Sequence, residues 1–290
     1  MSRGERRLGL LLLAPALAVL SVVTLYPVLA VLWLSVQRRV PVFDLAEHVG
    51  LRHYAFLATD PAFWNATWVT LVFTVASVAV EVVLGVLLAL LLAAQRRWQG
   101  AALALLLLPW CLPGVVTART FEWLYHPRAG IVNAMLGAVG LPAVNWLGDP
   151  DVALGALVAA DVWRTTPFVA LLCFARLQTI PVSVWEAAAV DGASAGRRLR
   201  AITLPLLLPV LLVAALFRTL DALRAFDLMF VLTGGGPAGT TETLTLYAYR
   251  SLFQMLQLGF GSAVATVVFA LVVAAAWGYQ RALDREATRT

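Results

Sequence analysis

The sequence predicts an all-α polytopic membrane protein with six transmembrane helices. Its 290 residues are 61% hydrophobic and only 13% charged, whereas a soluble domain carries about 25% charged residues. The apolar residues form long runs, and a helix of about 20 such residues is long enough to cross roughly 30 Å of hydrocarbon. We expect a single membrane-spanning domain over residues 1–290 with the lipid bilayer as its solvent.

Six apolar runs qualify as spans. Three of them carry between them a single charged residue, Glu81, and the other three contain several charges. The runs cover residues 8–36, 66–95, 101–125, 152–178, 203–232 and 258–280. The first run follows a basic leader, as a signal peptide does, but it continues without charge to Val36. A signal core has only about 7 to 15 residues, so we expect this run to be retained as the first span.

The orientation follows from the arginines, because all 21 basic residues are arginines. Twelve of them fall in loops on the side of the N-terminus and five on the opposite side. The positive-inside rule therefore predicts that both termini and the loop 179–202 are cytoplasmic. The net charge of +5 is accounted for by this asymmetry, so no nucleic-acid partner is expected.

The loop between the fourth and fifth spans is polar, and it leads into the fifth span as EAAAVDGASAGRRLRAITLP, residues 186–205. Ser183 and Glu186 have the spacing of a capping box, which predicts a short helix that starts at Ser183. Gly192 is placed to end this helix in the left-handed conformation, and Ser194 is placed to cap a second helix. The pattern predicts a short surface helix, a glycine turn and a return into the membrane.

The spacing of this loop carries a family resemblance. Glu186-Ala187-Ala188, then Gly192, then Ile202-x-Leu204-Pro205 resembles the EAA loop of the membrane subunits of ATP-binding-cassette (ABC) importers. The first span, APALAVLSVVTLYPVLAVLWLSVQR, and residues 225–244, AFDLMFVLTGGGPAGTTETL, are similar to the carbohydrate-type importers for maltose, trehalose and glycerol phosphate. The resemblance implies a type I ABC importer permease architecture and a multi-pass permease subunit in the bacterial cytoplasmic (inner) membrane.

The resemblance also implies partners. They are a second homologous permease subunit, a cytoplasmic ABC ATPase dimer, an extracytoplasmic solute-binding protein and a carbohydrate substrate. The GGGPAG stretch at residues 234–239 is not a nucleotide site, because a P-loop needs a lysine and the chain has none. We therefore expect no enzyme activity and no cofactor in this chain, with ATP and magnesium bound by the ATPase. The residues that the resemblance assigns to ATPase coupling are Trp185, Glu186, Ala187, Ala188, Asp191 and Gly192.

Charged residues inside the spans mark a candidate substrate path, because such residues are costly in hydrocarbon and face a cavity or a partner. They recur three positions apart, which allows neutralisation on one helix face: Arg119 with Glu122, Asp161 with Arg164, Arg218 with Asp221, and Arg224 with Asp227. Their depth favours a polar cavity open to the outside, where Trp123 and Trp163 would offer aromatic faces to a sugar. The candidates are Glu122, Trp123, Asp161, Arg164, Arg218, Asp221 and Asp227.

Other function classes receive less support. The three histidines, His48, His53 and His126, are predicted in outer loops or at a span end, which argues against an intramembrane serine hydrolase. Both cysteines lie in apolar runs, so no thiolate metal site is expected. An ion-coupled secondary transporter that uses the intramembrane carboxylates remains the alternative. Such a transporter would not need the EAA loop.

Overall fold

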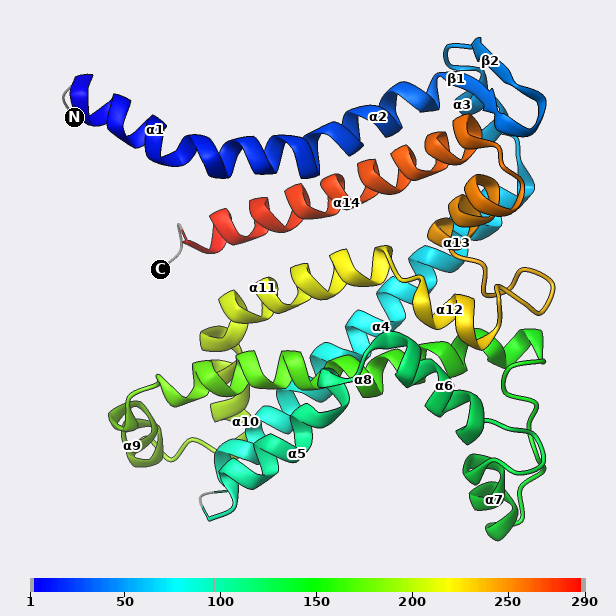
Figure 1. Ribbon diagram of the computed structural model, residues 1–290. Helices are drawn as coiled ribbons and strands as arrows, with labels where there is room; N and C mark the ends of the chain where they lie inside the picture. Colours follow the sequence, from blue (N-terminus) through cyan, green and yellow to red (C-terminus); the bar gives the residue numbers. More distant parts are fainter. Residues whose placement is uncertain (1–2, 96, 288–290) are drawn as a thin grey trace. The chain divides into compact units, whose positions relative to one another are not determined.

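The computed structural model describes residues 3–95 and 97–287, and most of them are helical (Figure 1). The α-helices are α1 (Arg3–Leu20), α2 (Tyr26–Ser35), α3 (Arg52–Leu57), α4 (Pro61–Ala94), α5 (Gln99–Cys111), α6 (Gly114–Leu124), α7 (Ile131–Ala138), α8 (Pro150–Gln178), α9 (Val182–Val190), α10 (Ala195–Arg198), α11 (Leu204–Leu223), α12 (Asp227–Leu232), α13 (Leu244–Tyr249) and α14 (Leu258–Ala287). Shorter 3-10 or π-helical segments are η1 (Ser21–Leu25), η2 (Pro41–Phe43), η3 (Leu199–Thr203) and η4 (Arg250–Gln254).

The predicted spans have counterparts among these helices. Within the described residues, five helical stretches are long and apolar enough to cross a membrane, and one bent helix pair makes a sixth if it is counted as a single span. The five stretches are Leu12–Ser35, Pro61–Ala94, Pro150–Gln178, Ala195–Leu223 and Leu258–Glu286. The all-α prediction is therefore confirmed, and two spans differ from it in their continuity.

The third predicted span, residues 101–125, is not one straight helix. It consists of α5 and α6, which meet at an angle of 94°. The break lies at Leu112 and Pro113, and both have extended backbone conformations. Proline has no N–H for the helical ladder and its ring disfavours a helical conformation in the residue before it. The apolar run contained this proline, but hydropathy alone does not register such a break.

The fifth predicted span, residues 203–232, is also interrupted. α11 ends at Leu223 and α12 begins at Asp227. The break is stabilised by side chains: Arg224 Nε donates to Leu220 O over 3.0 Å, and the hydroxyl group of Thr245 donates to Ala225 O over 2.6 Å. Non-helical backbone at membrane depth persists where its polar groups are satisfied in this way. The broken end of α11 thereby carries polar groups that a continuous span would not present.

The chain folds as two compact units. One comprises Met1–Phe63 and Tyr247–Phe269, and the other comprises Trp64–Leu246 and Ala270–Thr290. The first unit contains an antiparallel hairpin of β1 (Gln37–Val40) and β2 (Leu45–His48), in which Gln37 pairs with His48. In the second unit, α8 packs against α5 and α11, and α12 packs against α6 (Figure 1).

A hydrophobic core holds the second unit together. It is made by buried side chains of α4, α8 and α11 and of the turn after α8: Val86, Ala89, Leu92, Val169, Cys173, Phe174, Leu177, Ile180, Leu207 and Ala214. Burial of apolar area contributes roughly 25 cal/mol per Å². The same three helices carry the buried charges described next, so this core sets their separation.

Candidate functional site

A polar cavity of about 420 Å³ lies in the second unit. Its lining comes from the end of α5, the start of α6, the middle of α8 and the break between α11 and α12. The lining residues are Trp110, Gly114, Asp161, Arg164, Thr165, Arg218, Asp221, Arg224, Ala225, Phe226, Asp227 and Leu228. The two helix breaks thus meet at one cavity.

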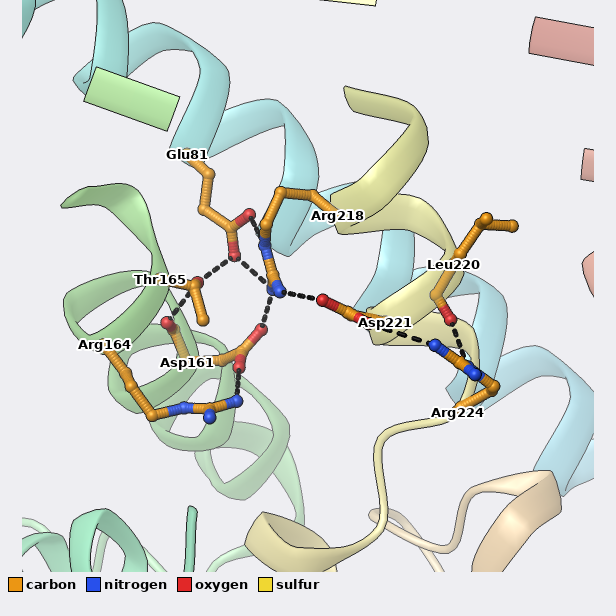
Figure 2. Close-up of polar contacts among 8 residues, drawn as sticks. All are labelled: Glu81, Asp161, Arg164, Thr165, Arg218, Leu220, Asp221 and Arg224. Atoms are coloured by element: carbon orange, nitrogen blue, oxygen red, sulfur yellow. Dashed lines mark hydrogen bonds and ion pairs between the residues drawn. The ribbon is translucent and has the colours of Figure 1, made fainter. Parts of the chain in front are cut away.

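Arg218 is the centre of a buried charge network (Figure 2). Its guanidinium donates to both carboxylate oxygens of Glu81 over 2.6 and 3.0 Å, and to Asp161 Oδ2 over 2.9 Å. The exposed fractions of the three residues are 4%, 0% and 3% for Arg218, Glu81 and Asp161. These contacts join α11 to α4 and α8, which lie far apart in the sequence.

Neighbouring side chains on α8 complete the network. Arg164 Nη2 donates to Asp161 Oδ1 over 3.3 Å. The hydroxyl oxygen of Thr165 lies 2.8 Å from Glu81 Oε1 and 2.6 Å from the carbonyl oxygen of Asp161. Asp161, Arg164 and Thr165 share one face of the helix because residues three and four apart lie above one another. The two buried carboxylates are therefore matched by two guanidinium groups.

The outer part of the cavity carries charges that are more exposed. Asp221 Oδ1 accepts from Arg224 Nη2 over 3.1 Å, and the two side chains are 59% and 58% exposed. Asp227 is exposed beside Gly114, where an added Cβ would lie 2.9 Å from Asp227 Oδ2. Among the side chains described, those of residues 12–95 and 97–286, none donates a hydrogen bond to the Asp227 carboxylate. This carboxylate is free to accept from a bound molecule.

The chemistry of the lining is balanced between donors and acceptors. Three carboxylates and three guanidinium groups face one space, and Trp110 adds an aromatic surface that stacks on Phe168 at 5.7 Å. Carboxylates only accept hydrogen bonds and guanidinium groups only donate them, whereas a hydroxyl group does both. The described residues contain no group of three His, Cys, Asp or Glu side chains that could hold a metal ion. The cavity therefore suits a polyhydroxylated molecule.

The structure gathers five of the seven predicted path residues around this cavity: Asp161, Arg164, Arg218, Asp221 and Asp227. Glu122 and Trp123 do not line it. Glu122 forms the predicted pair with Arg119 at 2.6 Å on α6, and Trp123 stacks on His126. Trp163 packs edge-to-face on Phe121. The aromatic residues that line the cavity are instead Trp110 and Phe226.

Two features of the predicted charge pairs are corrected. Arg224 pairs with Asp221 and not with Asp227, because the helix breaks between Arg224 and Asp227 and the spacing of three no longer places them on one face. Arg218 does lie 3.5 Å from Asp221, but its shorter contacts are to Glu81 and Asp161. The charge of Arg218 on α11 is therefore neutralised mainly by carboxylates of two other helices, α4 and α8.

Sequence reasoning missed Glu81, Thr165, Trp110 and Gly114 as parts of the site. Glu81 had a usable signal, since it is the one carboxylate in an otherwise uncharged apolar run. A charge in such a position has a partner or a cavity by default. Its partner Arg218 lies 137 residues away, and no local spacing points to it.

The loop helix α9 lies in the same unit and begins differently from the prediction. Pro181 occupies its N-cap position, and α9 starts at Val182. Ser183 is therefore already inside the helix, and the predicted capping box with Glu186 is wrong. Proline disfavours a helical conformation in the residue before it, and Pro181 itself, with φ −59° and ψ 140°, lies outside the helix. The proline decides the first residue of the helix.

The end of α9 agrees with the prediction. Gly192 has φ +66°, its N–H donates to Ala189 O over 3.1 Å, and the next N–H, of Ala193, donates to Ala188 O over 3.0 Å. These two bonds define a Schellman motif. Ser194 then caps α10, and its Oγ accepts from the N–H of Arg197 at 3.4 Å. The glycine turn is therefore confirmed.

The side chains of α9 divide into two groups. Glu186, Ala187, Asp191 and Gly192 are exposed. Ala188 is buried, and Trp185 packs against the hydrophobic core of this chain, so its indole is partly withdrawn from the surface. Val190, which the sequence analysis did not single out, is 87% exposed. The exposed face is small, and Val182, 67% exposed, and Val190 place an exposed apolar side chain at each end of α9.

A polar cavity among apolar helices, together with this capped loop helix, is the arrangement expected of a membrane permease. The chain belongs to the family described as binding-protein-dependent transport system inner membrane components, whose sequence profile matches residues 81–289. The matched region contains Glu81, the cavity residues and α9. The family consists of transporters and not of enzymes, and the chain is a multi-pass membrane permease.

Individual relatives agree with this assignment. The chain is 44% identical to the trehalose/maltose transport system permease protein MalF of Thermococcus litoralis over 93% of this chain and 91% of that protein. It is 41% identical to the sulfoquinovosyl glycerol transport system permease protein SmoG of Agrobacterium fabrum over 92% and 87%. Its fold matches a bacterial ABC transporter that imports the acidic polysaccharide alginate, with a TM-score of 0.81, 22% identity and 96% of each chain covered. The type I importer permease fold is thus shown.

Proposed function

We propose that the chain forms one half of the translocation path of an ATP-driven importer for a sugar or sugar derivative. The observation that carries the proposal is its 44% identity to a trehalose/maltose permease over almost the whole of both chains. The balanced cavity supports the same substrate class, because its carboxylates can accept hydrogen bonds from sugar hydroxyls and its guanidinium groups can donate to them. A solute-binding protein would deliver the substrate.

Within this proposal the cavity is the solute-facing surface. Asp227, Asp221 and Arg224 contact the substrate, since they are exposed at the α11–α12 break. Trp110 covers an apolar sugar face. Arg218, Glu81 and Asp161 are buried against one another and act as positioning residues. They hold α4, α8 and α11 around the space in which the solute moves.

The remaining subunits of the proposed importer are other polypeptides. A second, similar permease subunit completes the path, and a pair of ABC ATPases binds ATP and magnesium. The exposed residues Glu186, Ala187 and Asp191, with Val190 beside them, support α9 as the docking surface for one ATPase. The arginine asymmetry supports an orientation with both termini and α9 in the cytoplasm. Family membership favours this scheme over the ion-coupled alternative.

The test of the coupling loop is Gly192→Val. Nothing lies within 4 Å of a Cβ added at Gly192, so the substitution causes no clash inside this chain. It instead forces a β-branched residue to φ +66°, which is a strongly disfavoured conformation. We expect the spans to insert normally while the end of α9 is distorted. ATP-dependent uptake and co-purification of the ATPase subunits should both fall about tenfold or more, as a loss of roughly 1.4 kcal/mol in docking would produce.

Two variants serve as matched controls. Gly196→Val adds the same side chain at a glycine of the same loop that also has open space around its Cβ but no positive φ. Gly192→Asn introduces a side chain that tolerates the left-handed conformation. We expect both to keep most of the uptake. Normal uptake by Gly192→Val would show that α9 is only a connector and would refute the proposed docking.

A further inference from the structure

A second cavity, of about 330 Å³, lies in the first unit, and its lining is basic. It is formed by the β-hairpin, α3 and the start of α14. The lining residues are Arg38, Arg39, Val40, Val49, Arg52, His53, Phe56, Gln257 and Phe260. Three arginines thus line the cavity together with apolar and aromatic residues. We call this cavity the hairpin pocket.

The hairpin pocket is held in shape by contacts around its edge. His53 Nε2 donates to Gln37 O over 3.1 Å, since a carbonyl oxygen can only accept. Tyr54 Oη donates to Ser35 Oγ over 2.7 Å, which ties α3 to the end of α2. A Cβ on Gly259 would overlap the carbonyl oxygen of Gln37, so only glycine allows α14 to approach β1 this closely. These contacts hold β1, α3 and the start of α14 together around the pocket.

The arginines of the hairpin pocket have no acidic partners in the part of the chain that the structure describes. Among the side chains described, those of residues 12–95 and 97–286, Arg38, Arg39 and Arg52 make no ion pair and no side-chain hydrogen bond. Glu47 lies opposite Arg38 in the register of the hairpin, yet the two side chains do not pair. Unpaired guanidinium groups gathered around one cavity favour an anion, and their fork of donors matches a phosphate group.

The surroundings of the pocket place it at the surface of a bilayer. The apolar span Leu12–Ser35 ends immediately before β1, and Trp33 near its end is 62% exposed. Tryptophan at this position is typical of the membrane–water interface, and arginine just beyond a span reaches toward the headgroups. Arg38 is only five residues after Trp33. We therefore expect the guanidinium groups at the level of the lipid phosphates.

Exposed apolar side chains accompany the arginines. Val42, Phe43, Leu51 and Phe56 each expose more than half of their surface. A soluble acidic protein would leave much of this surface in water, whereas the interfacial region of a bilayer accommodates apolar and basic side chains together. The pattern therefore favours a lipid over an acidic protein as the occupant.

We propose that the hairpin pocket binds the phosphodiester headgroup of an anionic phospholipid. Arg38, Arg39 and Arg52 donate to the phosphate oxygens, and Phe56 and Phe260, which meet edge-to-face at 5.6 Å, contact the apolar part of the lipid next to the glycerol. The site anchors the first unit at the membrane surface. It does not depend on the proposed substrate or on the orientation of the chain.

The test measures lipid binding to the purified full-length chain in detergent by native mass spectrometry. The probes are phosphatidylglycerol, phosphatidylcholine and inorganic phosphate. We expect phosphatidylglycerol to bind more tightly than phosphatidylcholine, whose choline group opposes the arginines. Because a basic residue near an anionic membrane contributes about 1 kcal/mol, Arg52→Gln should weaken phosphatidylglycerol binding about fivefold. The double variant Arg38→Gln/Arg39→Gln should weaken it about 25-fold.

The matched control is Arg128→Gln, which removes an exposed arginine of the second unit that lies outside this pocket. It should leave lipid binding unchanged. Equal binding of phosphatidylglycerol and phosphatidylcholine, or an equal loss in Arg128→Gln, would overturn the site as a nonspecific charge effect. Displacement of phosphatidylglycerol by inorganic phosphate at millimolar concentration would overturn the assignment to lipid. Unchanged lipid binding with lost docking of the solute-binding protein in the pocket variants would assign the arginines to that protein.

Discussion

Each unit of the chain contains a cavity lined by three arginines. The two cavities differ in whether these arginines are paired with carboxylates. In the second unit, Arg164, Arg218 and Arg224 are all paired with carboxylates. In the hairpin pocket, Arg38, Arg39 and Arg52 are paired with none among the described residues. The arginine count is the same, so the carboxylates decide what each cavity can bind.

The difference follows from burial. A charge deep among apolar helices is stable only when it is paired and hydrogen-bonded, and this accounts for the two buried carboxylates around Arg218. An arginine at the surface keeps its water and needs no partner. The paired cavity presents nearly neutral groups to a solute, whereas the hairpin pocket keeps its positive charge. Pairing therefore favours hydroxyl-rich molecules in one unit, and its absence favours anions in the other.

The largest expected effect comes from breaking the buried pairing with Arg218→Met. Glu81 and Asp161 would then be buried without their shared guanidinium group. Removing one partner of a buried ion pair costs about 3–5 kcal/mol. We expect the free energy of unfolding, measured by titration of the purified chain from mild detergent into a denaturing one, to fall by about this amount.

A compensating variant separates lost charge from lost packing. The triple variant Arg218→Met/Glu81→Gln/Asp161→Asn removes the uncompensated carboxylates and should recover part of the lost stability. An unfolding free energy of Arg218→Met equal to that of the unmodified chain would mean that the network does not hold α4, α8 and α11 together. Failure of the triple variant to exceed Arg218→Met would assign the loss to packing.

Hydropathy predicts the spans because a run of about twenty apolar residues is typical of a transmembrane helix. It does not predict that Pro113 divides the third span or that Arg224 and Thr245 stabilise a break in the fifth. Both breaks depend on the chemistry of a few backbone groups, which hydropathy averaged over a window of residues does not register. The glycine turn at Gly192 was predictable for the opposite reason, since its conformation is decided within a few residues.

The site was predictable only where its contacts are local. Asp161 and Arg164 form the expected pair because they lie on one helical face. The partner of Glu81 is 137 residues away, and its identity is decided by the packing of α4 against the rest of the unit. Trp110 lines the cavity from the end of α5, next to the break at Pro113. The spacing of residues along the sequence therefore does not predict the parts of the site that depend on long-range packing or on helix breaks.

An intermediate effect is expected for Asp227→Asn, which alters the carboxylate of the paired cavity that no described side chain satisfies. A hydrogen bond to a charged group contributes about 1.5–3 kcal/mol, so losing it should raise the substrate concentration for half-maximal uptake about tenfold or more. Stability should change by less than about 0.5 kcal/mol, as for other exposed sites. Uptake by the reconstituted importer at a series of sugar concentrations measures the effect, and an unchanged half-maximal concentration would remove Asp227 from the solute path.

The smallest loss of stability is expected for Arg224→Gln, and it sharpens the comparison because Arg224 is paired but exposed. Its ion pair with Asp221 involves side chains that are 58% and 59% exposed, and exposed pairs contribute about 0.2–1 kcal/mol. The glutamine amide also still offers a donor near the end of α11. We expect the free energy of unfolding to fall by less than about 1 kcal/mol, whereas Arg52→Gln, which breaks no pair, should leave it unchanged. The same detergent titration compares both variants with Arg218→Met. The exposed pair touches the buried network through the 3.5 Å contact between Arg218 and Asp221. A loss for Arg224→Gln as large as that for Arg218→Met would show that the pair is also coupled to that network in energy. The distinction between the two cavities would then rest on connection to the network, and burial of the individual arginine would not explain it.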